Sequence, residues 1–142
     1  MPLISIVIPL YNKERFIKET LKSVFSQSIQ DYEVIIVDDG STDNSASIIN
    51  DINDHRIRIF SNSNNGVSHA RNFGISKSNS DLIALIDGDD LWETNHLENL
   101  YKLYTSFPGC GLYATAYYKK YFNGRKIKPK YNGVSANHFG II

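Results

Sequence analysis

The stretch that decides the fold is Leu82–Asp90, which reads LIALIDGDD. Its first five residues are apolar and have the length and composition of a buried strand. Three aspartates, Asp87, Asp89 and Asp90, follow directly. Carboxylates this close repel one another, so they favour a cation or ligand site over a simple helix cap. Hard oxygen ligands of this kind suit Mg²⁺ or Mn²⁺.

An apolar strand that runs into a polar cluster occurs three more times along the chain. Segments with helical spacing of apolar residues separate these strands, and the resulting β-α repeat predicts an α/β fold with a mostly parallel sheet. Ligands of open α/β sheets bind at the carboxyl ends of the strands. The expected strands are Leu3–Ile8, Val34–Val37, Ile57–Phe60 and Leu82–Ile86, and the expected helices contain Ile17–Phe25, Ile48–Ile52, Val67–Gly74 and Leu97–Tyr104.

The last quarter of the chain follows a different pattern. Gly111–Phe122 is predicted as a strand, and Asn123-Gly124 is a strong signal for a hairpin turn. The chain stops at Phe139–Ile142, an apolar ending with nothing after it to complete a unit. We therefore expect residues 1–142 to form a single domain that is truncated, with exposed apolar surface that favours a homodimer.

Composition and charge exclude several classes of protein. A single cysteine, Cys110, excludes a disulfide framework. No apolar run reaches the ~18–20 residues of a membrane-spanning helix. The N-terminus lacks the basic start and small-residue cleavage site of a signal peptide, so a cytoplasmic location is expected.

The net charge of zero hides an asymmetry. From Lys119 onward there are six basic residues and no acidic one, whereas residues 1–118 carry nine basic and fifteen acidic side chains, a net charge of −6. The acidic part argues against binding to nucleic acid. The basic tail is either a solvated hairpin or a contact with phosphates or an anionic membrane surface, which would place the protein at the inner face of the membrane.

Other strand ends also carry candidate ligand-binding residues. Asp38 and Asp39 stand where the second strand ends, and the turn and helix cap in residues 40–43 do not account for them. Tyr11 offers a flat face that can stack on a base, although a core or surface tyrosine is the ordinary alternative. Arg71 can hydrogen-bond a base or a phosphate, or form a surface salt bridge.

Taken in order, these pieces resemble the family 2 glycosyltransferases, nucleotide-sugar enzymes of the Rossmann-like GT-A fold, in which helices cover both faces of the sheet. The resemblance covers about residues 3–105 and makes about 1–118 a donor-binding core, with 119–142 the start of an acceptor half. Each motif is weak alone, but their order is specific. The motifs are SIVIPLYN at 5–12, VDDGSTD at 37–43, NGVS at 65–68, ARN at 70–72 with Gly74, and IDGDDLW at 86–92.

The resemblance implies a role for the residues on the base side of the site. Pro9 and Tyr11 would flank the base, with Tyr11 stacking on it and Asn12 beside them. Asp39 would hydrogen-bond the base edge, which is uracil if the donor is a UDP-sugar, with Asp38 nearby.

Roles on the phosphate side follow in the same way. Arg71 would contact the base or the diphosphate. Asp87 and Asp89 would form a DxD-type motif, with one carboxylate near the ribose. Either Asp89 or Asp90 would hold the Mn²⁺ or Mg²⁺ ion that bridges the diphosphate.

The activity implied is inverting, metal-assisted transfer of a sugar to a hydroxyl acceptor, in polysaccharide or glycan synthesis. The catalytic base would be a carboxylate beyond residue 142, so no catalytic residue is assigned. Two alternatives stay open. One is a haloacid-dehalogenase-like phosphatase with Asp87 as nucleophile and Asp89 as acid, against which Asp90 stands where Thr or Val is expected. The other is a nucleotide-sugar-binding module without turnover.

Overall fold

A computed structural model describes residues 1–121 and 124–128 of the chain. It divides into two compact units, of which the first covers Met1–Leu97 and the second begins at Glu98. The expected division near residue 118 stays a prediction. In chain order, the elements are β1 (Ile4–Leu10), α1 (Ile17–Phe25), β2 (Tyr32–Asp38), α2 (Ser45–Asn50), β3 (Ile57–Ser61), α3 (Val67–Ser76), β4 (Ile83–Leu85), α4 (His96–Ser106), β5 (Lys119–Lys120) and β6 (Lys126–Ile127).

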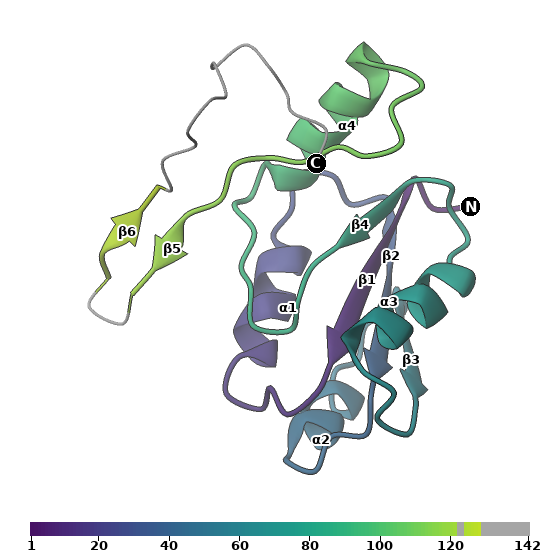
Figure 1. The fold of residues 1–142 in the computed structure, drawn as a ribbon, viewed down its shortest axis with the longest axis vertical. Coiled ribbons are helices and arrows are strands. Elements are labelled where there is room, and N and C mark those ends of the chain that lie inside the picture. The colour runs from purple at the N-terminus through teal and green to yellow at the C-terminus, as the bar shows by residue number, and fades with distance from the viewer. Residues whose placement is uncertain (122–123, 129–142) are drawn as a thin grey trace. The chain divides into compact units, whose positions relative to one another are not determined.

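The first unit is built on a four-stranded sheet in the order β3-β2-β1-β4 (Figure 1). Every neighbouring pair is parallel, which confirms the predicted α/β fold. In this register Leu10 lies opposite Asp38, and Asp38 lies opposite Ser61. The carboxyl ends of β1, β2 and β3 therefore coincide, and the loops that follow them emerge at one edge of the sheet.

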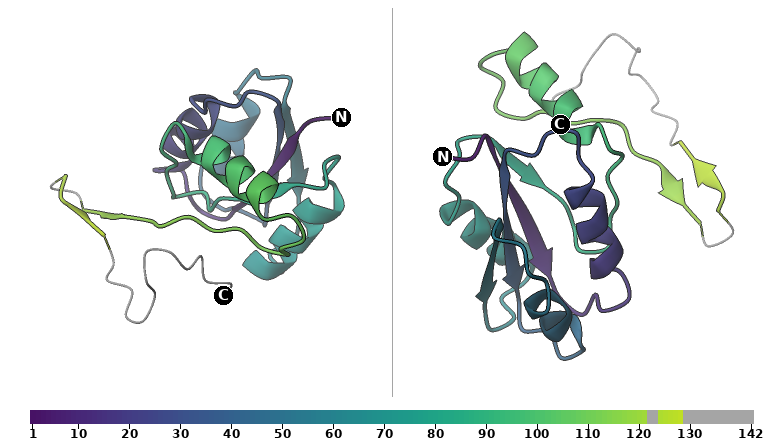
Figure 2. Two further views of the ribbon diagram at one scale, coloured as in Figure 1. Left: turned by 90° about the horizontal axis from the view of Figure 1, so that it is seen from above. Right: turned by 180° about the vertical axis from the view of Figure 1, so that it is seen from behind.

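Helices cover both faces of this sheet, as predicted. The views in Figure 1 and Figure 2 show α1 and α2 on one side of it and α3 on the other. Residues of β1 alternate between the two faces, with Ile6 and Ile8 in the core on the α1 and α2 side and Val7 in the core on the α3 side. Because β1 and β2 are buried on both faces, their sequences read as nearly continuous apolar runs.

Helix α3 lies unusually close to the sheet. Gly74 faces Val7, and a Cβ atom at this position would overlap the Val7 side chain and also lie 3.3 Å from Val37 Cγ2. Ala70, one turn earlier, is fully buried. These two small residues let α3 approach β1, so the start of α3 stands beside the end of that strand.

The amino ends of the strands are held by a polar network around Glu33. Its carboxylate accepts hydrogen bonds from Ser5 Oγ at 2.7 Å and from Arg58 Nη1 at 2.9 Å. The backbone N–H of Asn79 also donates to Glu33, at 2.7 Å. Burial alone would raise the pKa of Glu33, but these hydrogen bonds outweigh burial and lower it. The network lies at the edge of the sheet opposite the carboxyl ends of the strands.

The structure corrects several predicted boundaries. Strand β1 continues to Leu10 instead of ending at Ile8, β4 is limited to Ile83–Leu85, and α2 ends before Ile52. The prediction of a strand over Gly111–Phe122 is wrong for residues 111–118, which form no strand. A turn is present, because β5 and β6 pair antiparallel and Tyr121 N–H donates to the Arg125 carbonyl at 2.9 Å.

The predicted turn residue Asn123 and the apolar ending 139–142 lie outside the described residues. Among the residues that are described, no helix combines the length and the apolarity needed to cross a membrane.

Candidate functional site

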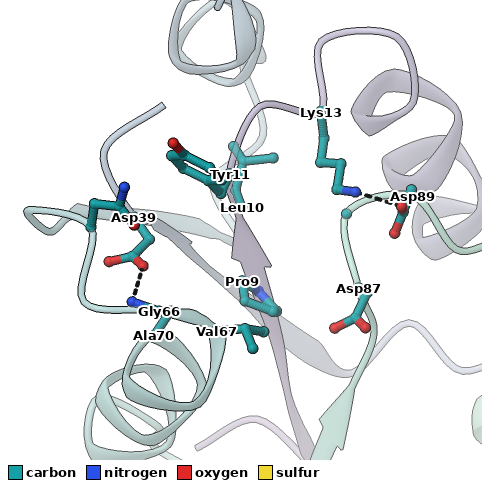
Figure 3. A pocket seen from close by; sticks show the side chains of 12 residues that line it. Pro9, Leu10, Tyr11, Lys13, Asp39, Gly66, Val67, Ala70, Asp87 and Asp89 are labelled. Carbon is teal, nitrogen blue, oxygen red and sulfur yellow. Dashed lines mark hydrogen bonds and ion pairs between the residues drawn. The ribbon is translucent and has the colours of Figure 1, made fainter. Parts of the chain in front are cut away.

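A pocket of about 360 Å³ opens at the carboxyl edge of the sheet (Figure 3). Its walls come from the ends of β1, β2 and β4 and from the start of α3. Strand order reverses at β1, since β2 and β3 lie to one side of it and β4 to the other. Ligands of open α/β sheets bind at such a point. The lining residues are Pro9, Leu10, Tyr11, Lys13, Asp39, Asn64, Gly66, Val67, Ala70, Asp87, Gly88 and Asp89.

Five of the predicted site residues lie on this lining. They are Pro9, Tyr11, Asp39, Asp87 and Asp89. The register of the parallel strands explains this convergence, because residues far apart in the sequence follow neighbouring strand ends.

Asp39 is almost fully buried, with 3% of its surface exposed. Its Oδ1 accepts a hydrogen bond from the Asn65 N–H at 2.9 Å, and its Oδ2 accepts one from the Gly66 N–H at 2.7 Å. Gly66 has φ +91°, a conformation that suits glycine. The carboxylate thus binds backbone amides at the start of α3, where the helix dipole favours negative charge.

Asn12 and Asp38 were predicted in the site, and the structure places neither on the lining of the pocket. Asn12 Oδ1 accepts from the Thr42 N–H at 2.8 Å, and the Asn12 N–H donates to Ser41 Oγ at 3.0 Å. Asp38 Oδ1 accepts from the Ser41 N–H at 3.1 Å. Asn12 therefore joins the loop after β1 to the loop after β2, and Asp38 stabilises the loop after β2, next to the pocket lining.

Tyr11 is the aromatic residue among the described residues that line the pocket. It follows β1 directly, and 43% of its surface is exposed. In Figure 3 its ring stands between Asp39 and Lys13. An aromatic face in this position is available for stacking on a planar ligand.

Asp87 is paired with Arg71 of α3. Arg71 Nη2 donates to both carboxylate oxygens of Asp87, at 2.6 Å and 2.9 Å. Arg71 does not line the pocket itself, and its Nε atom is buried without a hydrogen-bond partner among the described residues. The predicted phosphate-side residues thus come together, and Arg71 forms the salt bridge that was its alternative, with Asp87 as a partner that the sequence did not identify.

Asp89 is paired with Lys13, whose Nζ lies 2.6 Å from Asp89 Oδ2. Lys13 was not among the site residues predicted from the sequence. The one feature of the sequence that could have identified Lys13 is its position, two residues after Tyr11, in the loop that follows the first predicted strand. Roughly a third of each side chain is exposed, so this ion pair is open to solvent.

Asp90 lies outside the pocket lining, in a turn closed by its own N–H and the Asp87 carbonyl at 3.0 Å. Burial and, after it, the charges of Asp89 and Asp87 raise the pKa of Asp90. Within the described part of the chain, no three or more His, Cys, Asp or Glu side chains gather closely enough to hold a metal ion. One or two aspartates still fit Mg²⁺ or Mn²⁺, which commonly take one or two carboxylates and complete their shell with phosphates and water.

The turn that carries Asp87, Asp89 and Asp90, here called the acidic turn, is held in place by side chains of helix α1. Thr20 Oγ1 donates to the Gly88 carbonyl at 3.1 Å, and Ser23 Oγ accepts from the Trp92 N–H at 3.1 Å. Gln27 Nε2 donates to the Glu93 carbonyl at 2.9 Å. Thr20, Ser23 and Gln27 follow an i, i+3, i+7 spacing, so one stripe of α1 holds the backbone from residue 88 to residue 93.

Comparison with known proteins gives the family. The family described as Glycosyl transferase family 2 matches residues 5–138. An uncharacterized glycosyltransferase of Haemophilus influenzae is 44% identical over 101 residues, which cover 69% of this chain and 40% of the relative. Chondroitin synthase of Pasteurella multocida is 39% identical over 100 residues, which cover 69% of this chain and 10% of that protein.

Solved structures of glycosyltransferases are similar in fold to this chain. The crystal structure of S. aureus TarS has a TM-score of 0.64 and 26% identity, over 73% of this chain and 20% of TarS. Mannosyltransferase PcManGT from Pyrobaculum calidifontis, in complex with GDP-Man and Mn²⁺, has a TM-score of 0.67 and 25% identity, over 72% of this chain and 32% of that protein. These structures confirm the GT-A fold, and the chain covers 40% or less of each of these four proteins. The chain belongs to glycosyl transferase family 2.

Proposed function

We propose that this pocket binds the nucleotide part of a nucleotide-sugar and that the protein transfers the sugar to a hydroxyl acceptor. The observation that carries the proposal is the convergence of Tyr11, Asp39, Asp87 and Asp89 on one pocket at the point where strand order reverses. Family membership favours this function over the phosphatase alternative. PcManGT, which holds GDP-Man and Mn²⁺, supports the same class of donor.

Base recognition is assigned to Tyr11, Pro9 and Asp39. The Tyr11 ring would stack on the base. Each Asp39 oxygen accepts one backbone hydrogen bond and keeps a lone pair, so the carboxylate can accept a further bond from a base N–H. Uracil presents one such N–H, and the motif resemblance favours a UDP-sugar.

The diphosphate side is assigned to the acidic turn and Arg71. Asp89 or Asp90 would hold a Mn²⁺ or Mg²⁺ ion, which stabilises the charge that develops on the departing nucleoside diphosphate. Asp87 would lie near the ribose. The motif resemblance supports a contact between Arg71 and the base or diphosphate, and the pairing of Arg71 with Asp87 brings it next to the pocket lining.

The transfer itself is proposed to be a single displacement that inverts the anomeric carbon. An acceptor hydroxyl would attack that carbon while a carboxylate base removes its proton. We expect this base outside residues 1–142. Chondroitin synthase and hyaluronan synthase of P. multocida, each 39% identical over 100 residues, support polysaccharide synthesis as the setting. Peripheral membrane association at the cytoplasmic face and a homodimer stay predictions.

Isothermal titration calorimetry with UDP, GDP and CDP, each with and without Mn²⁺, tests the proposal. UDP should bind most tightly, and Mn²⁺ should strengthen its binding. Asp89→Asn combined with Asp90→Asn should abolish the Mn²⁺ effect, and Tyr11→Ala should weaken binding by ~1–3 kcal/mol, the usual value of one stacked base. Asp81→Asn, an exposed carboxylate at the opposite end of β4, is the matched control.

Absence of nucleotide binding by the unaltered protein would refute the donor site. Binding that survives both sets of site variants would place the nucleotide elsewhere. Release of UDP from a UDP-sugar in the presence of hydroxyl acceptors would then separate a transferase from a binding module without turnover.

A further inference from the structure

We propose that Lys13 is a counter-ion that changes partner when the donor binds. In the donor-free protein its ammonium group neutralises Asp89. When a divalent cation takes the Asp89 carboxylate, the ammonium group turns to the diphosphate of the donor. This inference rests on the proposed function and names a residue that sets the cation requirement of that site.

The backbone of Lys13 is held by hydrogen bonds, whereas its side chain is partly exposed. Its N–H donates to Ser45 Oγ at 2.8 Å, and its carbonyl accepts from the N–H groups of Phe16 and Ile17 at 2.9 Å and 3.0 Å. About a third of the side chain is exposed. A lysine carries three donors on a flexible stem, so it can exchange one anionic partner for another without moving the backbone.

Charge in the pocket makes this exchange necessary. Among the described residues that line it, three are acidic, Asp39, Asp87 and Asp89, and Lys13 is the one basic residue. Arg71 stands behind this lining and is paired with Asp87 through two short contacts. A diphosphate entering a net negative pocket is repelled unless cations accompany it. A divalent ion held by Asp89 would supply positive charge, and the ammonium group of Lys13 would then be available to the diphosphate.

Gly88 lies beside the stem of Lys13. A Cβ atom at position 88 would lie 3.5 Å from Lys13 Cγ and 3.2 Å from Leu10 Cδ1. The stem therefore runs beside a backbone that has no side chain, between the two aspartates of the turn. The contact with Lys13 Cγ would be an ordinary van der Waals contact, whereas the contact with Leu10 would be tight.

Competition for Asp89 predicts opposite effects of one substitution on two ligands. Lys13→Met keeps the apolar stem and removes the charge. Without the competing ammonium group, Mn²⁺ should bind the nucleotide-free protein about two- to fivefold more tightly, the fold-change expected for a solvent-exposed ion pair. Without the phosphate contact, UDP should bind the Mn²⁺-loaded protein about tenfold or more weakly, the loss of a charged hydrogen bond.

Mn²⁺ binding is measured from the paramagnetic resonance signal of the free ion, and UDP binding by calorimetry. Lys18→Met, which removes the same charge from an exposed position of α1, should change neither affinity. Lys13→Arg keeps the charge, so it should retain most of the UDP affinity, and it provides a second variant should Lys13→Met unfold. Circular dichroism confirms the fold of each variant.

Opposite shifts of the two affinities support the exchange of partners. A parallel fall in both affinities would show a structural role only, and no change in either would show that the ion pair is incidental. Both of these results overturn the inference while leaving the proposed function intact. Failure of the unaltered protein to bind UDP, GDP and CDP would instead refute the proposed function itself.

Discussion

Replacing Asp39 with asparagine separates two roles that the structure gives this residue. The carboxylate is 3% exposed and accepts hydrogen bonds from the Asn65 and Gly66 N–H groups. Asparagine keeps one acceptor oxygen but turns an NH₂ group toward the other backbone N–H. One charged hydrogen bond is lost, worth ~1.5–3 kcal/mol, and a buried donor is left unsatisfied, worth ~1–3 kcal/mol. Since the remaining bond is retained and the loop can relax, we expect a net loss of about 3 kcal/mol.

Urea and thermal unfolding measure this loss. For a unit of this size, about 3 kcal/mol corresponds to a fall of roughly 12–24 °C in Tm. Asp43→Asn is the matched control, because Asp43 also accepts two backbone hydrogen bonds, from Ser45 at 2.9 Å and from Glu14 at 3.1 Å, outside the pocket. We expect that control to lose about 1 kcal/mol, the usual net value of a hydrogen bond, because Asp43 is less buried than Asp39.

Calorimetry well below either Tm then isolates the second role. Asp39→Asn should weaken UDP binding about tenfold, and Asp43→Asn should leave it unchanged. A Tm within a few degrees of the unaltered protein would show that the Asp39 hydrogen bonds do not stabilise α3. Equal UDP affinity in both variants would show that Asp39 does not contact the base.

Three further predictions concern the support of the sheet and the site. Thr20→Val removes the donor to the Gly88 carbonyl and keeps the side-chain shape, so affinity for UDP with Mn²⁺ should fall severalfold and recover in Thr20→Ser, as measured by calorimetry. Gly74→Ala drives a methyl group into Val7 and should lower the free energy of unfolding in urea by ~1–3 kcal/mol or more. The pKa of Glu33 is lower in the folded protein than its ordinary value of 4.5. The stability that Glu33 contributes is therefore complete above pH 4.5 and is lost as the pH falls through the folded-state pKa. Urea unfolding of Glu33→Gln should accordingly depend less on acid pH than unfolding of the unaltered protein.

Most of the fold follows from sequence periodicity alone. The apolar runs that predict β1 and β2 are nearly continuous, because both strands are buried on both faces of the sheet. Strand β3 is shorter. The apolar spacing of Ile17, Leu21 and Val24 likewise predicts α1, and all three residues are buried. Where burial is complete, composition is sufficient to identify an element.

Boundaries and the later strands were less predictable, because they depend on partners. Strand β4 pairs with β1 over three positions only, so its apolar neighbours Leu82 and Ile86 extend past the ladder. Residues 111–118 have the composition of a strand, yet they pair with no strand in the described residues. Strand propensity reflects a fit to a half-buried sheet surface, and without such a surface it does not produce a strand.

The site was predictable in its acidic and aromatic residues but not in its ion pairs. Asp87 and Asp89 follow a strand end, a position that the sequence reveals. Their partners Arg71 and Lys13 lie on other elements, and only the register of β1 beside β4 and the close approach of α3 bring them near. Pairing between loops depends on this three-dimensional register, which periodicity does not encode.

The partners of the three lining carboxylates also bear on which of them is able to accept a metal ion. Asp39 binds backbone amides, which cannot leave without opening the start of α3. Asp87 accepts hydrogen bonds from Arg71 Nη2 on both of its carboxylate oxygens, and Arg71 lies on a helix packed against the sheet. Asp89 contacts the ammonium group of Lys13 through one oxygen only, and a lysine stem is flexible, so we expect this partner to exchange most easily of the three. We therefore expect the cation to take Asp89 before Asp87, and Asp89→Asn alone to weaken Mn²⁺ binding more than Asp87→Asn does. The reverse order in a Mn²⁺ titration of the two variants would show that the mobility of the partner does not decide the metal position.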